Sequence, residues 1–235
     1  MDLKILIAFI INIIIIILGY TSLTIELNNS LERNTYYINF WGFFRFFTND
    51  GNIYSTLVSC VLFSFQFTIL FLKINSNILK NNILYLISLG SVVSEIIILL
   101  VVLILLLPQF GIFIISSYTM FNLHILIPIL VTIRFIFFEY KKNKIDNIKT
   151  LYGTLPIMIY GLITFFLVIF KVFTKENNKI PYPFFEIYDN PWWFSLLSIG
   201  GIVATTFGLC ILMNYLNEQF GNYEFKNEKK NSLLS

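Results

Sequence analysis

Six long apolar runs, separated by short polar segments, dominate the pattern of hydrophobic and polar positions along the chain. They cover roughly residues 4–21, 53–72, 83–107, 119–139, 151–173 and 194–216. Each is close to the ~20 residues that an α-helix needs to cross the hydrocarbon core of a bilayer. Because the runs are continuous and do not alternate, they predict helices and not barrel strands. We therefore predict an all-α fold, a single bundle of six transmembrane helices over residues 1–216 with a polar tail at 217–235.

The composition supports a membrane protein. Of the 235 residues, 57% are hydrophobic and 12% are charged, and the mean hydropathy is +0.78. A soluble domain of this length cannot bury so much apolar surface. No basic run accompanies a soluble platform, which argues against nucleic-acid binding. Lys4 precedes the first run as in a secretory signal, but the run is long and no small-x-small cleavage site follows, so we expect an uncleaved first helix.

The loops between the runs carry an uneven share of the basic residues. If the N-terminus lies inside the cell, ten Lys and Arg residues fall in cytoplasmic segments and five in outer segments, while Arg134 lies within the fourth run. Cytoplasmic loops are enriched in Lys and Arg. The distribution predicts that both termini are cytoplasmic, and that the second and fourth helices begin at the outer face.

Four polar groups lie within the apolar runs, namely Gln66, Glu95, His124 and Arg134. A charge at the bilayer centre costs on the order of 2.5–3.5 kcal/mol, so such groups usually pair or serve a function. We expect Gln66 to make an interhelical hydrogen bond. We expect Glu95 to pair with Arg134, and leave open that it is protonated or approaches His124. No second histidine and no suitable carboxylate cluster accompanies His124, so a metal site is not expected.

The stretch "FFRFFTNDGNIYS" places Thr48 and several other polar residues just before the second run. Thr, Asn and Asp are common helix N-caps, and capping is the simplest role for Thr48. The predicted topology adds a second role, because Thr48 and His124 then lie at the same membrane face and at similar shallow depth. A hydroxyl beside an imidazole is the minimum pair for nucleophilic attack on an acyl carbon.

Three motifs together resemble those of the androgen-induced and androgen-dependent TFPI-regulating membrane protein family and its bacterial six-span relatives. They are "FFTNDGN" before the second run, "NLHILIP" in the fourth and "IPYPFFEIYDNP" before the sixth. The resemblance implies a multipass threonine hydrolase of lipid esters, such as fatty-acid esters of hydroxy fatty acids, in a bacterial cell membrane. It implies that Thr48 is the nucleophile and His124 the base. The chain departs from the family pattern at Gly51, where a serine is expected.

Further polar residues are candidates to support this pair. Glu186 and Asp189 fall on the same predicted face as His124, and either could orient its imidazole. The remaining candidates are Asn49, Asp50, Asn52 and Asn122. No cofactor is expected, the partners are a fatty-acyl ester and membrane lipids, and the oligomeric state is left open.

Two other functions remain open on the sequence alone. A small transporter or a lipid-binding membrane protein would use Glu95, Arg134 and His124 as a polar route, although the two halves show no convincing internal repeat. A purely structural role would leave the same residues packed between helices.

Overall fold

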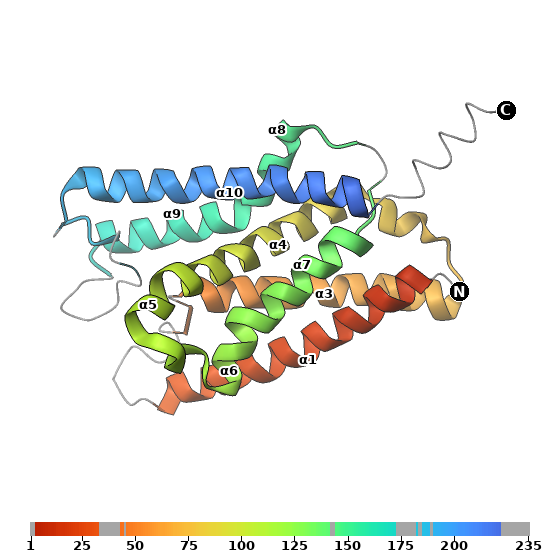
Figure 1. Ribbon diagram of the computed structural model, residues 1–235, viewed down its shortest axis with the longest axis horizontal. Coiled ribbons are helices and arrows are strands. Elements are labelled where there is room, and N and C mark those ends of the chain that lie inside the picture. Colours follow the sequence, from red (N-terminus) through yellow and green to blue (C-terminus); the bar gives the residue numbers. More distant parts are fainter. Residues whose placement is uncertain are drawn as a thin grey trace.

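The computed structural model describes residues 3–32, 43–44, 46–141, 144–172, 182, 185–188 and 190–221. All the long elements of this described part are helices (Figure 1). Six of its helical segments are long and apolar enough to cross a membrane. The chain is therefore an integral, multipass membrane protein, and the predicted six-helix bundle is confirmed. The first residue of the first helix and the last residue of the last helix lie at the same end of the bundle.

The main helices are named as in Figure 1. The long ones are α1 (Leu3–Glu32), α3 (Phe47–Leu72), α4 (Asn82–Val101), α7 (Ile127–Phe138), α9 (Leu155–Ile169) and α10 (Trp192–Phe220). Short helical segments extend or join them, namely η1 (Ser76–Lys80), η2 (Val102–Leu106), α5 (Leu107–Phe110), η3 (Gly111–Ile115), α6 (Tyr118–Phe121), η4 (Asn122–Leu126), α8 (Asn147–Thr150) and η5 (Leu151–Thr154). We call the end of the bundle where α3 begins the Thr48 end, and the end where α7 and α10 finish the Lys141 end.

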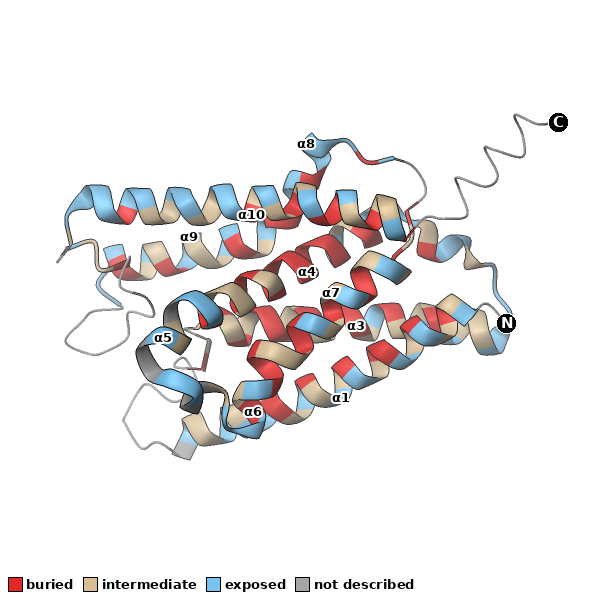
Figure 2. Cartoon of the chain, in the orientation of Figure 1, coloured by how far each residue is buried: buried red, intermediate tan, exposed pale blue. Residues whose placement is uncertain are grey.

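The α4 helix forms the centre of the bundle, and α9 and α10 form its most exposed side (Figure 2). Within the most apolar window of each span, 61% of the residues are buried in the span that contains α4 and 17% in that of α10. Leu89, Val92 and Val93 of α4 are fully buried in the main core. Leu196 and Leu197 of α10 are exposed, as expected for side chains that face lipid.

Two spans contain a π-helical turn, and in both the turn comes just before a proline. In η2 the Leu107 amide donates to the Val102 carbonyl, and in η4 the Ile127 amide donates to the Asn122 carbonyl. Pro108 and Pro128 follow directly. Proline lacks an N–H and its ring clashes with the carbonyl four residues earlier. A widened turn accommodates this ring without ending the helix, and such turns are frequent at functional sites.

The second span begins earlier than predicted, and this changes the role of Thr48. The α3 helix starts at Phe47, and Phe46 is its N-cap, with extended backbone and no side-chain capping bond. Thr48 therefore lies inside the first turn, and the expectation that it caps the helix is wrong. The polar residues that suggested a loop before residue 53 instead form the first turn and a half of α3.

Candidate active site

The side-chain amides of Asn49 and Asn52 hold the first turns of α3 in place. Asn49 Nδ2 donates to the Phe43 carbonyl at 2.7 Å. Asn52 Nδ2 donates to the Thr48 carbonyl at 2.8 Å and to the Leu123 carbonyl of η4 at 3.0 Å. Both side chains are buried. The supporting role predicted for these two residues is thus a structural one, since they hold the Thr48 turn against its neighbours.

Two tyrosine hydroxyls converge on the start of α3. The Tyr182 hydroxyl is positioned to bond the Phe47 backbone and the Thr48 hydroxyl. The Tyr160 hydroxyl, from α9, is positioned to bond the same Phe47 backbone and the Thr164 side chain. The first amides of a helix have no partner within the helix, so they are free to bond such groups. The site therefore gathers hydroxyl groups from three separated parts of the chain around the Thr48 turn.

The Tyr182 hydroxyl remains protonated at neutral pH. Burial raises its pKa to about 12, and the hydrogen bonds from Phe47 and Thr48 offset this only in part. Tyr182 can therefore donate a proton in a hydrogen bond to Thr48 or to a bound ligand. Tyr182 is half-buried against the core, whereas the later aromatic residues Tyr188, Trp192 and Trp193 are exposed.

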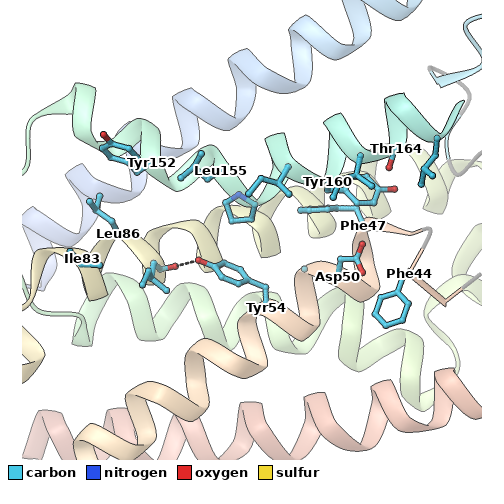
Figure 3. Close-up of a pocket in the computed structure, with 16 residues that line it drawn as sticks. Phe44, Phe47, Asp50, Tyr54, Ile83, Leu86, Tyr152, Leu155, Tyr160 and Thr164 are labelled. Carbon is cyan, nitrogen blue, oxygen red and sulfur yellow. Dashed lines mark hydrogen bonds between the residues drawn. The ribbon is translucent and has the colours of Figure 1, made fainter. Parts of the chain in front are cut away.

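A large apolar cavity opens beside this turn, between α3, α4, η5 and α9 (Figure 3). Its volume is about 850 Å³, which is within the range of small-molecule sites. Asp50 is the one ionisable carboxyl group among the described residues that line it. Tyr54 also lines it and donates its hydroxyl to the Ile87 carbonyl at 2.8 Å. The cavity could hold an acyl chain, with its polar end near Asp50 and Tyr160.

A second cavity, of about 350 Å³, lies on the other side of Phe47 and Tyr160, which line both. Tyr182 lines the second cavity only. The described lining residues of the two cavities include neither Thr48 nor His124. The Thr48 hydroxyl is connected to them through its neighbours Phe47 and Asp50 and through its hydrogen bond to Tyr182.

His124 lies in the π-turn η4 and is largely buried, with 7% of its surface exposed. Its Nδ1 is 2.9 Å from the Met120 carbonyl. A carbonyl only accepts hydrogen bonds, so Nδ1 carries the proton and Nε2 holds the lone pair of the neutral ring. Because Asn52 joins the Thr48 carbonyl to the Leu123 carbonyl, the two predicted catalytic residues lie on adjoining backbone segments.

The remaining predicted supporting residues are Asn122, Glu186 and Asp189. Asn122 Nδ2 donates to the Ser22 hydroxyl of α1 at 3.2 Å, so it holds η4 against α1. Glu186 is half-buried in the segment before α10, and its backbone carbonyl accepts a hydrogen bond from the Asn190 amide. Asp189 lies outside the described residues.

Gly51 occupies the position where the family pattern has a serine, and the packing explains a glycine there. A Cβ atom at Gly51 would come within 2.6 Å of Ile98 Cδ1 on α4. The α4 helix thus approaches α3 closely at this point. Gly51 also lines the larger cavity, so the absent side chain leaves space in it.

The buried charges pair differently from our expectation. Arg134 Nε forms an ion pair with Glu139 Oε1 at 3.4 Å, just beyond the end of α7. Neither carboxylate oxygen of Glu95 makes a hydrogen bond in the described part of the chain. The expected Glu95–Arg134 pair is therefore replaced by Arg134–Glu139, because Glu139 follows α7 closely enough to fold back on it.

The predicted interhelical bond of Gln66 is confirmed. Its Oε1 accepts a hydrogen bond from Asn12 Nδ2 of α1 at 2.9 Å. Asn12 Oδ1 in turn accepts from Arg134 Nη1 at 2.9 Å. Gln66 is thus part of a buried network around Arg134.

Comparisons with known protein families, with curated proteins and with solved structures gave no match. The family resemblance therefore rests on the three sequence motifs alone.

Proposed function

We propose that this protein is a hydrolase of lipid esters, embedded in a bacterial cell membrane, with Thr48 as nucleophile and His124 as base. The observation that carries the proposal is the position of the Thr48 hydroxyl. It lies in the first turn of α3 beside the Tyr182 hydroxyl, and its neighbours Phe47 and Asp50 line a cavity large enough for an acyl chain.

The proposed reaction has two steps. Thr48 Oγ1 forms a bond to the acyl carbon, the ester C–O bond breaks, and the Thr48 proton passes through His124 Nε2 to the leaving alcohol. Water then gives its proton to His124 and attacks the acyl-threonine, which releases the fatty acid and restores Thr48. The oxyanion of each step would be stabilised by the positive end of the α3 dipole and by the Tyr182 hydroxyl.

The apolar cavity supports a long-chain substrate. Its walls are mainly Phe, Ile and Leu side chains, which match an acyl chain, and Asp50 and Tyr160 lie at the end near the Thr48 turn. The ester would then lie at the Thr48 end of the bundle, near the membrane interface. Both termini would be cytoplasmic, which places this end at the outer face.

The test is the release of fatty acid from a long-chain ester by purified protein in detergent. Thr48→Ala should abolish hydrolysis, and labelling of the wild type by a fluorophosphonate probe should also be lost. Thr68→Ala is the matched control, because Thr68 lies in the same helix and its hydroxyl donates to the Phe65 carbonyl of that helix. Full activity of Thr48→Ala would refute the mechanism.

A lipid-binding protein without catalysis is the second candidate. It is favoured by the absence of Thr48 and His124 from the described walls of the two cavities. In that case the wild type would retain a fatty acid or ester through purification and would not cleave it. Thr48→Ala would then bind the same lipid with unchanged affinity.

A further inference from the structure

A row of buried polar side chains joins the facing surfaces of α3 and α4. On α4, Ser91, Ser94 and Glu95 fall at spacings of three and four residues, which places them on one helix face. Ser91 Oγ donates to Ser55 Oγ of α3 at 3.0 Å. Asn52 lies one turn before Ser55 on the same face of α3. All five side chains have 0% exposure.

Several oxygens in this row lack a partner in the described part of the chain. They are both carboxylate oxygens of Glu95, the Ser94 hydroxyl and the Asn52 side-chain oxygen. The side-chain NH₂ group of Asn52 donates to the Thr48 and Leu123 carbonyls, and its side-chain oxygen has no partner among the described residues. The Ser55 hydroxyl is close enough to interact with Glu95, but the two do not meet the geometry of a hydrogen bond. Buried polar atoms are normally paired, so four such oxygens on two helices that the Ser91–Ser55 bond joins point to a ligand.

The charge balance defines what this ligand would be. Arg134 is within electrostatic reach of Glu95, but it is bonded to Glu139, Asn12, Ser59 and Ser88. Glu139 therefore compensates the charge of Arg134, and an ionised Glu95 would have no counter-charge of its own. A buried carboxylate without a counter-charge is costly. One positive charge neutralises it, and the surrounding hydroxyl and amide oxygens are hard ligands of the kind that small, hard cations prefer.

We propose that Glu95, Asn52, Ser55, Ser91 and Ser94 form a binding site for a small monovalent cation, Na⁺, in the middle of the bundle. Glu95 supplies the charge, and the other four supply neutral oxygens from two helices. A bound ion would hold α3 against α4. It would also fix Asn52, whose amide positions the Thr48 and Leu123 carbonyls. The site does not depend on the proposed hydrolase activity, because it is defined by the ligands alone.

Thermal unfolding of the purified protein in detergent tests the site. The melting temperature in NaCl is compared with that in N-methyl-D-glucamine chloride at equal ionic strength. A ligand that binds only the folded state raises the melting temperature with its concentration, here by about 3–6 °C for a chain of this size. Equal melting temperatures in the two salts would overturn the proposal.

Glu95→Gln provides the decisive variant. It should abolish the response to Na⁺, and in the sodium-free salt it should melt at or above the wild-type temperature, because the uncompensated charge is gone. Asp50→Asn is the matched control, a carboxyl-to-amide change on α3 outside the site, and it should keep the full response. A Na⁺ response that persists in Glu95→Gln would overturn the proposal.

A second variant keeps the test valid if Glu95→Gln does not fold. Ser91→Ala removes one ligand and should raise the Na⁺ concentration for half the stabilisation several-fold. Direct binding of radioactive ²²Na⁺ to the wild type should saturate at one ion per chain. If no ²²Na⁺ binds, or if melting depends on pH and not on Na⁺, Glu95 is simply protonated. Either result would refute the cation site.

Discussion

The two polar regions of the bundle differ in how completely their groups are bonded. Around Arg134 and Glu139, charges, amides and hydroxyls bond one another: Ser88 donates to Glu139 Oε1 at 2.7 Å while accepting from Arg134. Around Glu95 and Asn52, side-chain oxygens remain without partners in the described chain. Both regions are equally buried, so burial does not separate them. The difference indicates that the first region holds helices together, whereas the second is arranged for a ligand or for chemistry.

The Lys141 end extends the bonded region. Lys141 Nζ donates to Asn214 Oδ1 at 2.9 Å and to Glu218 Oε1 at 2.8 Å, and it lies over the Tyr85 ring. Burial lowers the pKa of Lys141, and the hydrogen bond and charge of Glu218 oppose that shift. Asn217 Nδ2 donates to the Phe135 and Glu139 carbonyls at the end of α7. These contacts join α10 to α7 and leave little freedom at this end.

The largest expected effect is on activity at the less bonded region. His124→Ala should lower hydrolysis of a long-chain ester by about 10²- to 10⁴-fold, the usual loss when a general base is removed. The melting temperature should change little, because the hydrogen bond of the imidazole in the described part of the chain, to the Met120 carbonyl, lies within its own span. Asp50→Asn tests Asp50 as an alternative base. A loss of hydrolysis as large as that of His124→Ala would assign the role of base to Asp50.

A large effect on stability is expected at the Arg134–Glu139 pair. Arg134→Met leaves Glu139 buried without its counter-charge, and breaking such a pair costs about 3–5 kcal/mol. Melting in detergent and the yield of folded protein would measure it. The double variant Arg134→Met with Glu139→Gln should recover much of the loss. A single variant as stable as the wild type would contradict the idea that this pair organises the bundle.

A smaller effect is expected from Tyr182→Phe, which removes the hydroxyl that bonds Thr48. A neutral hydrogen bond contributes about 1 kcal/mol, so hydrolysis should fall roughly 5- to 10-fold with stability almost unchanged. Tyr188→Phe is the control, because its hydroxyl bonds the Ile169 carbonyl away from the Thr48 turn. Equal activities of the two variants would remove Tyr182 from the site.

The smallest effect is expected from Lys141→Met. Lys141 forms an ion pair with Glu218, and water reaches this pair because the Glu218 side chain is 25% exposed. Partly exposed ion pairs contribute about 0–1 kcal/mol, so the melting temperature should fall by only a few degrees. A fall as large as that of Arg134→Met would show that the Lys141–Glu218 pair contributes as much to stability as the buried Arg134–Glu139 pair.

The sequence predicted the spans well because bilayer thickness fixes their length and composition. It predicted the Gln66 bond because a lone amide within a span has few other options. It missed Glu139 as the partner of Arg134, since a carboxylate just after a span resembles any loop residue. It also placed Thr48 before the helix, because Thr, Asn and Asp commonly cap helices. In the structure, tyrosine hydroxyls are positioned to meet the first amide of α3, that of Phe47. The roles of Tyr160 and Tyr182 depend on distant segments meeting, which no local pattern reveals.

The π-turn at η4 has a consequence for how such a chain can change. A widened turn is equivalent to one extra residue within an otherwise regular helix. Deleting one residue between Asn122 and Leu126 would restore an α-helical turn and leave the residues after it near their present orientation, so Arg134 would keep its ion pair with Glu139. Deleting one residue within α7 would instead rotate the residues after it by about 100°. The π-turn is therefore a place where this span can change its length with little change in the packing of α7.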